Sequence, residues 1–274
     1  MLRQSTRHRM LQSLFWNPVG QRLVPRITKL GRIFDTVVRG YSLMGISNGE
    51  RWLSSLLEQD PVIFDVGFHD GESSSELLAV RPNARVHAFD PSRFAKSAHD
   101  TRFGDDARVS FHNMAISDAP GVLTFYDYEN MCNSLAPRKD DLDQTAQTYD
   151  VPVSTLDSVC AKEGIASINF LKIDAEGYDL NVIEGARGLL ENQSIDIIMF
   201  EFASGWAATK RYLWEADALC KDVPYKMFHM FNGFLCPFVY DVRKDSCCTL
   251  PAMYVLISEK RLARGNIPMR SYSF

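Results

Sequence analysis

The sequence predicts an α/β fold with a mostly parallel sheet flanked by helices. From residue 62 onward, short apolar runs typical of buried strands alternate with longer amphipathic segments. Several of these runs end in an acid or an amide, and the first leads into a loop with two glycines. Strands joined through helices are expected to run parallel, so their carboxyl ends share one edge of the sheet.

Composition indicates a soluble globular protein. The chain has 274 residues, 46% hydrophobic and 23% charged, enough for one α/β domain with additions or a small domain pair. A formal net charge of -4 argues against a protein that coats nucleic acid over its whole surface. We find no membrane-spanning run and no secretory signal, and the six scattered cysteines lack the spacing of a zinc site or disulfide framework. These features predict a cytoplasmic protein with reduced thiols.

The first forty residues are basic and amphipathic. Eight arginines and lysines accompany a single acid, Asp35, and apolar residues recur at helical spacing. We favour a helical extension packed on the domain with its basic face in water. Peripheral contact with an anionic membrane, and a transit peptide, are the alternatives. We expect the extension over residues 1–60, the main domain over 61–260 and a tail over 261–274.

The first strand is expected at 62–66, followed by a tight loop and a helix to about 81. The loop glycines, Gly67 and Gly71, carry no Cβ and let the backbone approach a ligand, although a plain strand-to-helix turn explains them equally well. The polar stretch 127–150 indicates a long loop or lid. The other expected strands lie at 86–89, 108–112, 121–126, 151–155, 168–173, 195–200, 225–231, 233–240 and 252–257. Continuous helices are expected through 180–190 and 207–220.

Polar residues stand at or just after the ends of four strands: Asp65, Asp90, Asn113 and Asp174. In a parallel sheet these positions fall on one edge. That edge suits a nucleoside whose ribose hydroxyls are held by a carboxylate, the role we expect for Asp90. Each acid alone is more often a solvated strand end or a helix cap, but four in register favour a binding edge.

The chain resembles the FkbM-type methyltransferases, a branch of the class I S-adenosylmethionine-dependent enzymes. The resemblance covers residues 62–202 and implies a Rossmann-like fold with a mostly parallel seven-stranded sheet. It rests on the order and spacing of five blocks, each weak alone. The blocks are Phe64-Asp65-Val66-Gly67 with Gly71, Ala88-Phe89-Asp90-Pro91, Asn113-Met114-Ala115-Ile116-Ser117, Thr155-Leu156-Asp157, and Leu171-Lys172-Ile173-Asp174-Ala175-Glu176-Gly177 with Ile183-Glu184-Gly185-Ala186.

The resemblance implies S-adenosylmethionine as the cofactor. The residues expected to bind it around the methionine, ribose and adenine parts are Asp65, Gly67, Phe68, Gly71, Asp90, Asn113, Met114 and Ala115. The family usually has Glu at the position of Asp90, and the shorter acid keeps the charge. The residues between the two loop glycines, Phe68-His69-Asp70, also depart from the family pattern, so the contacts of His69 and Asp70 are left open.

The expected reaction is methylation of a hydroxyl on a sugar, polyketide or other small molecule. Asp174 and Glu176 are candidates for general base or substrate positioning, and His69 is a second possible base. Asp174 with Glu201 could instead hold a divalent cation. A helix cap is the structural alternative for Glu176. Tyr126, Asn133 and Ser134 in the lid are expected to line the substrate site.

Two other functions compete. An NAD-dependent oxidoreductase would also place an acid at Asp90, but the chain lacks Gly-x-Gly-x-x-Gly in its first loop. A non-catalytic Rossmann-like binding module leaves the strand-end acids unexplained. A nucleic-acid methyltransferase is disfavoured, because the block that would present a flipped base is missing after the strand at 168–173.

Overall fold

The computed structural model describes residues 48–128, 133–137, 146–231, 233–245 and 251–271. Of the predicted N-terminal extension, α3 (Asn48–Ser55) falls within this part, and residues 1–47 with the basic segment lie outside it. Among the described residues, no helix combines the length and apolarity that crossing a bilayer requires.

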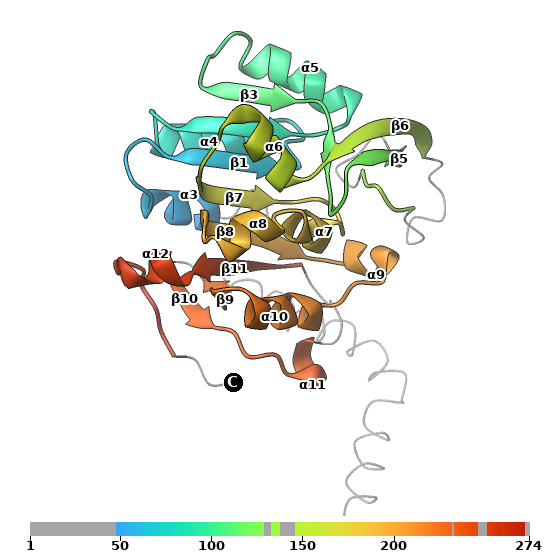
Figure 1. Ribbon diagram of the computed structural model, residues 1–274. Coiled ribbons are helices and arrows are strands. Elements are labelled where there is room, and N and C mark those ends of the chain that lie inside the picture. The colour runs from blue at the N-terminus through green and yellow to red at the C-terminus, as the bar shows by residue number, and fades with distance from the viewer. Residues whose placement is uncertain (1–47, 129–132, 138–145, 232, 246–250, 272–274) are drawn as a thin grey trace, which may run out of the picture.

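A single large sheet forms the centre of the molecule (Figure 1). It has eight strands in the order β10-β9-β11-β8-β7-β1-β2-β3. The five strands from β8 to β3 are parallel, as predicted: β8 (Ile195–Phe202), β7 (Ile168–Ile173), β1 (Val62–Val66), β2 (Arg85–Phe89) and β3 (Val109–His112). β11 (Ala252–Ser258) runs antiparallel between β8 and β9 (Tyr225–Phe231).

The class I methyltransferase fold is confirmed, with one strand more than the seven expected. The additional strand is β10 (Phe234–Pro237), which pairs antiparallel with β9 at the edge of the sheet. The tight connection contains Gly233 in a left-handed conformation (φ 83°), where a residue with a Cβ would be strained. A hairpin therefore extends the sheet by one strand without changing the order of the others.

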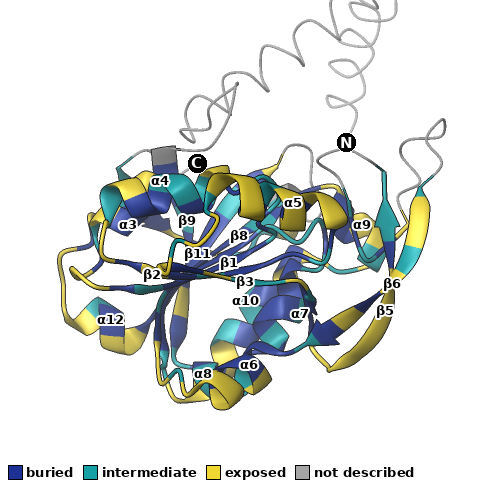
Figure 2. Ribbon diagram, turned by 90° about the horizontal axis from the view of Figure 1, so that it is seen from above, coloured by how far each residue is buried: buried dark blue, intermediate teal, exposed yellow. Residues whose placement is uncertain are grey.

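Helices cover both faces of the sheet, with their exposed sides outward (Figure 2). One layer holds α3, α4 (Glu72–Val80) and α5 (Arg93–Arg102). The other holds α6 (Leu156–Glu163), α7 (Asp179–Glu184), α8 (Arg187–Glu191), α9 (Gly205–Thr209) and α10 (Leu213–Asp222). Two short helices, α11 (Val242–Asp245) and α12 (Glu259–Ala263), flank the C-terminal strands.

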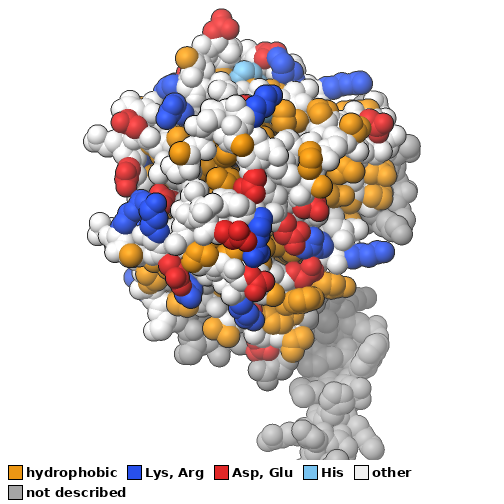
Figure 3. All heavy atoms as spheres, viewed as in Figure 1, with side chains coloured by type: hydrophobic (Ala, Val, Ile, Leu, Met, Phe, Trp, Pro, Cys, Tyr) orange, Lys and Arg blue, Asp and Glu red, His pale blue; other side chains and the backbone are white. Residues whose placement is uncertain are grey.

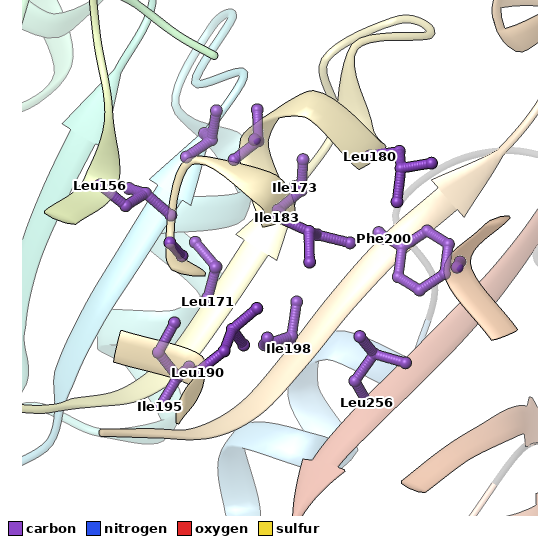
Figure 4. Packing of buried hydrophobic residues seen from close by; sticks show 14 of the residues in the cluster. Leu156, Leu171, Ile173, Leu180, Ile183, Leu190, Ile195, Ile198, Phe200 and Leu256 are labelled. Carbon is purple, nitrogen blue, oxygen red and sulfur yellow. The ribbon is translucent and has the colours of Figure 1, made fainter. Parts of the chain in front are cut away.

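The larger core lies between the second helix layer and the parallel strands (Figure 4). Leu171 and Ile198 come from β7 and β8, and Ile183 and Leu190 from the helices above them; all four are fully buried. Burying a side chain of this size stabilises the fold by about 1.5–3 kcal/mol. The apolar run 197–200 within β8 is explained by burial on both faces of the sheet.

The predicted continuous helices through 180–190 and 207–220 are both interrupted. Between α7 and α8, a Cβ on Gly185 would lie 2.1 Å from the carbonyl oxygen of Ser117, so the chain needs glycine to pass this close. Between α9 and α10, Lys210 is left-handed, with φ of 57°. Tertiary contact and backbone conformation thus override the apolar spacing that predicted single helices.

A second, three-stranded sheet stands beside the carboxyl end of β3 (Figure 1). It consists of β4 (Ala115–Ile116), β6 (Gln147–Ser154) and β5 (Gly121–Asp127). The two ends of the predicted lid are therefore strand, since β5 ends at Asp127 and β6 begins at Gln147. Its remainder includes the described segment 133–137, while residues 129–132 and 138–145 lie outside the described part.

Candidate functional site

A cavity of about 450 Å³ opens at the carboxyl ends of the parallel strands. Its walls come from the loops after β1, β2 and β7, the end of β8, the small sheet and the segment 133–137. Of the residues predicted from sequence, those lining it are Gly67, Phe68, His69, Asp90, Met114, Ala115, Asn133, Ser134, Asp174, Glu176 and Glu201. The predicted residues that do not line it are Asp65, Gly71, Asn113 and Tyr126.

The glycine loop brings the ends of β1 and β7 together. A Cβ on Gly67 would lie 1.9 Å from the carbonyl oxygen of Asp174, and Gly67 has φ of 87°. Gly71 has φ of 76° at the start of α4, and its absent Cβ leaves room for the Phe68 ring. Gly67 therefore allows the backbones of the loops after β1 and β7 to pack closely beside the cavity. Gly71 does not line the cavity, but it leaves space for the Phe68 ring, which does.

Asp90 is held by its backbone neighbours. Its Oδ2 accepts a hydrogen bond from the N–H of His69 at 2.9 Å, and its Oδ1 accepts one from the N–H of Ser92 at 2.8 Å. Burial raises the pKa of this carboxyl, and the two N–H donors oppose the rise. Each oxygen keeps a further lone pair, so the fixed carboxylate can still accept two hydroxyl groups from a ligand.

Asn113 supports Asp90 instead of lining the cavity. Its side-chain amide donates to the carbonyl oxygen of Asp90 at 2.9 Å. The neighbouring Met114 and Ala115 do line the cavity, as predicted. Asn113 therefore supports the backbone of a cavity-lining residue, Asp90, and does not itself line the cavity.

Asp65 is a buried structural partner of Lys172. The carboxylate is fully buried, accepts a hydrogen bond from the hydroxyl of Ser74 at 2.7 Å and lies 3.2 Å from the Lys172 ammonium. Lys172 lines the cavity and also lies 3.8 Å from Asp174. Burial lowers the pKa of Lys172, but the acids around it outweigh this and raise it, so the side chain stays charged. Asp65 thus does not line the cavity, and it anchors Lys172, which does.

Glu50 on α3 is a further buried acid near this pair. Its side chain is 5% exposed, and its Oε2 has no hydrogen-bond partner among the described residues. Burial raises its pKa to about 7, although the charge of Lys172 acts in the opposite direction. Sequence reasoning missed it because Glu50 lies in the segment assigned to the extension.

Several acids gather around the loop after β7. Asp179 accepts hydrogen bonds from the N–H groups of Gly177 at 3.1 Å and Ala175 at 3.4 Å, and these bonds fix the backbone of the loop after β7. Burial, and then the charge of Asp174, raise the pKa of Asp179 to about 7 and of Glu201 to about 8. Glu201 therefore carries a proton at neutral pH, while the side chain of Asp174 is 43% exposed at the cavity.

The backbone of this loop is tightly constrained. Glu176 has φ of 50°, a conformation that costs a non-glycine residue about 1–3 kcal/mol and is found mainly at functional sites. A Cβ on Gly177 would lie 2.3 Å from the carbonyl oxygen of Gly205 at the start of α9. The predicted helix cap for Glu176 is not formed, since α7 begins after Tyr178.

The segment 133–137 is fastened to the same loop. The hydroxyl of Ser134 donates to the carbonyl oxygen of Glu176 at 3.0 Å, and the Asn133 side chain accepts from the N–H of Tyr128 at 2.7 Å. Tyr126 exchanges backbone hydrogen bonds with Ser134 and does not line the cavity, which corrects the expectation for that residue. His69 lies at the opposite wall, its ring centroid 4.9 Å from that of Phe94.

Among the described residues, one group of three potential metal ligands lies close together, and it contains neither Asp174 nor Glu201. The predicted cation pair thus has no third His, Cys, Asp or Glu ligand within reach in this part of the chain. Cavity-lining residues that sequence reasoning missed include Lys172, Phe125 and Tyr178. Of these three, only Lys172 gave a signal in the sequence, as the one charged residue of the strand 168–173.

Comparison with known proteins decides the family. Residues 65–230, more than half of the chain, match the model of the methyltransferase FkbM domain. The chain belongs to the FkbM methyltransferase-domain family. The match includes the loop after β1, Asp90 and the loop after β7.

Two curated relatives share this region. The 2-O-methyltransferase NoeI of Sinorhizobium fredii is 30% identical over 154 residues, covering 51% of this chain and 63% of the relative. The 31-O-demethyl-FK506 methyltransferase FkbM of Streptomyces tacrolimicus is 29% identical over 159 residues, covering 47% and 60%. The match thus spans less than two thirds of either relative.

Solved structures show more distant likeness. The methyltransferase FkbM of Methylobacillus flagellatus has a TM-score of 0.44 at 15% identity, covering 74% of this chain and 47% of that one. SMU.1697c of Streptococcus mutans, a putative methyltransferase in complex with SAH, has a TM-score of 0.44 at 11% identity, covering 77% and 96%. At these scores the likeness carries no argument beyond the family match.

The cavity fits the cofactor that this family implies. A fixed carboxylate at Asp90 suits two ribose hydroxyls, and the lining by Met114 and Ala115 offers an apolar border for a base. The glycine loop at Gly67 and the acids after β7 lie along the same cavity, where the methionine part would extend. The residues present therefore meet the chemical needs of S-adenosylmethionine.

Proposed function

We propose that this protein is an S-adenosylmethionine-dependent methyltransferase that methylates a hydroxyl group of a small molecule. The observation that carries the proposal is the cavity at one edge of the sheet. The Asp90 carboxylate, which suits ribose hydroxyls, and the acids after β7 both line it, within the residues 65–230 that match the family. The two relatives named above are both O-methyltransferases by name, which favours oxygen as the acceptor atom.

When bound, S-adenosylmethionine supplies an electrophilic methyl group. The chain must then place the acceptor hydroxyl in line with that group and remove its proton. We assign proton removal to Asp174, because its carboxylate is exposed at the cavity while Glu201 behind it is protonated at neutral pH. Lys172, 3.8 Å from Asp174, fixes the orientation of that carboxylate.

The acceptor is expected to enter between the glycine loop and the segment 133–137. Both Asn133 and Ser134 line the cavity there, but their side chains already make the hydrogen bonds described above. We therefore assign them to shaping the entrance, with His69 at the other wall and the Phe94 ring packed against it. A hydroxylated sugar or polyketide surface would suit such a mixed aromatic and polar entrance.

Three further expectations belong to the proposal. A cation held by Asp174 and Glu201 is the alternative to a metal-free base, and chelation tests it. Nucleic acid is not expected as substrate; on the face seen in Figure 3 acidic and basic side chains are interspersed, in keeping with this. Membrane contact through residues 1–40 is a prediction about a segment outside the described part.

Incubating the purified chain with S-adenosylmethionine and a panel of hydroxylated acceptors tests the proposal, with S-adenosylhomocysteine production as the readout. We expect turnover with at least one polyhydroxylated acceptor, and none with its permethylated form. Turnover only with amines, thiols or RNA would contradict hydroxyl methylation. Unchanged turnover after EDTA treatment would exclude the cation alternative.

A further inference from the structure

A group of three metal-ligating side chains lies outside the cavity, on the opposite side of its wall. His87 comes from β2, His112 from the edge strand β3 and Glu163 from the last turn of α6 (Figure 1). His87 Nδ1 lies 3.3 Å from His112 Nε2 and 3.3 Å from Glu163 Oε2. His112 Nδ1 lies 3.5 Å from Glu163 Oε1.

The two separations that share His87 Nδ1, to His112 Nε2 and to Glu163 Oε2, match the edges of a tetrahedral metal site. Zinc bonds of about 2.0–2.2 Å to nitrogen and oxygen place neighbouring ligand atoms about 3.3–3.6 Å apart. One ligand atom from each of the three residues can be chosen so that all lie within 4.8 Å of one another.

The ligands are held by the fold before any ion binds. The His112 ring stacks on Phe89 with centroids 4.5 Å apart and an interplanar angle of 12°. The His87 ring lies against Phe64, with centroids 5.0 Å apart. α6 ends immediately after Glu163, because Gly164 adopts the left-handed conformation at the C-cap.

The three side chains contact one another directly, and two features of the group favour a cation among them. His87 Nδ1 carries at most one proton, yet it faces both His112 Nε2 and Glu163 Oε2. Glu163 also stands at the C-terminal end of a helix, where the helix dipole disfavours an acid. A cation among the three side chains resolves both conflicts.

We propose that His87, His112 and Glu163 bind a divalent transition-metal ion, for which Zn²⁺ is the best chemical match. Two imidazoles and one carboxylate are typical zinc ligands, and they would leave one position for water. The exposed fractions of the three side chains, 14%, 13% and 30%, leave a route for ion and water. This proposal is independent of the proposed function.

The ion would be structural. It would tie the edge strand β3 to β2 and α6, three elements that are far apart in sequence. The carbonyl oxygen of His112 accepts the N–H groups of Asp90 at 3.3 Å and Met114 at 2.8 Å, so the ion would also stabilise the wall of the cavity without entering it. Removing the ion is therefore expected to lower thermal stability first.

The test uses the full chain, freed of purification tag and stripped with EDTA. ZnCl₂ is titrated by calorimetry, and the melting temperature is followed with and without zinc. We expect one high-affinity equivalent and a rise in Tm of about 5–10 °C when free zinc exceeds its Kd about 100-fold. Glu163→Gln and His112→Asn should each weaken zinc binding about tenfold or more, as loss of a ligand requires.

Glu191→Gln is the matched control, because Glu191 also ends a helix on the same layer but pairs with Arg187 at the surface. It should bind zinc like the unaltered chain. X-ray absorption of the zinc-loaded unaltered chain gives a readout that needs no variant, and only nitrogen and oxygen ligands at about 2.0–2.2 Å are expected. A sulfur ligand, equal zinc affinity in Glu163→Gln, or no zinc-dependent rise in Tm would each overturn the proposal.

Discussion

The backbone N–H of His69 donates to Oδ2 of Asp90 at 2.9 Å, which joins the loop after β1 to the carboxylate after β2. His69 reaches this position in a left-handed conformation, with φ of 51°. The residues Phe68-His69-Asp70, which depart from the family pattern, therefore have a structural role, because the backbone N–H of His69 orients the Asp90 carboxylate. The His69 side chain remains available at the cavity wall.

Replacing Lys172 by Met is expected to destabilise the fold by about 3–5 kcal/mol, because it leaves the fully buried Asp65 carboxylate without its counter-ion. The free energy of unfolding from urea titrations measures this. Adding Asp65→Asn to Lys172→Met should recover part of the loss. Strictly additive losses in the double variant would show that the pair is not coupled.

Gly67→Ala should cost at least about 2 kcal/mol, because a Cβ at φ of 87° would meet the Asp174 carbonyl at 1.9 Å. Gly121→Ala is the matched control, since a Cβ there has nothing within 4 Å. Chemical denaturation of both variants measures the difference. If both tolerate alanine equally, the loops after β1 and β7 are not packed as described.

Glu50 gives the fold a pH dependence of known sign. Burial raises the pKa of Glu50 from its ordinary value of 4.5 to about 7, so the folded state binds more protons than the unfolded state between these values. Stability is therefore greatest below pH 4.5 as far as this group is concerned, and falls as pH rises toward 7 and beyond.

Glu50→Gln removes that dependence. We expect the variant to be more stable than the unaltered chain at pH 8.5 by on the order of 1–3 kcal/mol, and similar to it near pH 5. Unfolding titrations at the two pH values provide the measurement, with the exposed Glu191→Gln as control. A stabilisation that is the same at both pH values would contradict the assignment to Glu50 ionisation.

Asp174→Asn and Glu201→Gln separate the proposed base from its protonated neighbour. Loss of a general base should lower kcat by about 10²–10⁴-fold in Asp174→Asn while cofactor binding is largely retained. Glu201 is already protonated at pH 7, because its pKa is raised to about 8, so Gln mimics it and costs much less activity. Equal losses in both variants, together with sensitivity to EDTA, would favour the cation alternative.

The sequence allowed the parallel sheet and part of the cavity lining to be predicted, because strand ends such as Asp90 and Asp174 share an edge by topology alone. The sequence could not distinguish the residues that line the cavity from the residues that hold them in place. Asp65 lies on a strand buried on both faces, so alternation does not reveal its partner Lys172, 107 positions away. Asn113 likewise turns to the carbonyl of Asp90, a contact that no spacing encodes.

Contacts between distant segments explain the other differences. The break between α7 and α8 depends on Gly185 passing Ser117, and the additional strand β10 depends on a hairpin. The His87, His112 and Glu163 group escaped notice because its members come from three separate elements with no motif spacing. Such groups become visible only once the sheet order is known.

Calorimetric titration with S-adenosylhomocysteine tests the central claim most directly, comparing the unaltered chain with Asp90→Asn. The control is Asp100→Asn, which alters an exposed acid on α5. We predict one site in the unaltered chain and in the control, and about 10–100-fold weaker binding in Asp90→Asn, because hydrogen bonds from the ribose to a charged acceptor are lost. No binding by the unaltered chain, or equal affinity in Asp90→Asn, would contradict the cofactor assignment.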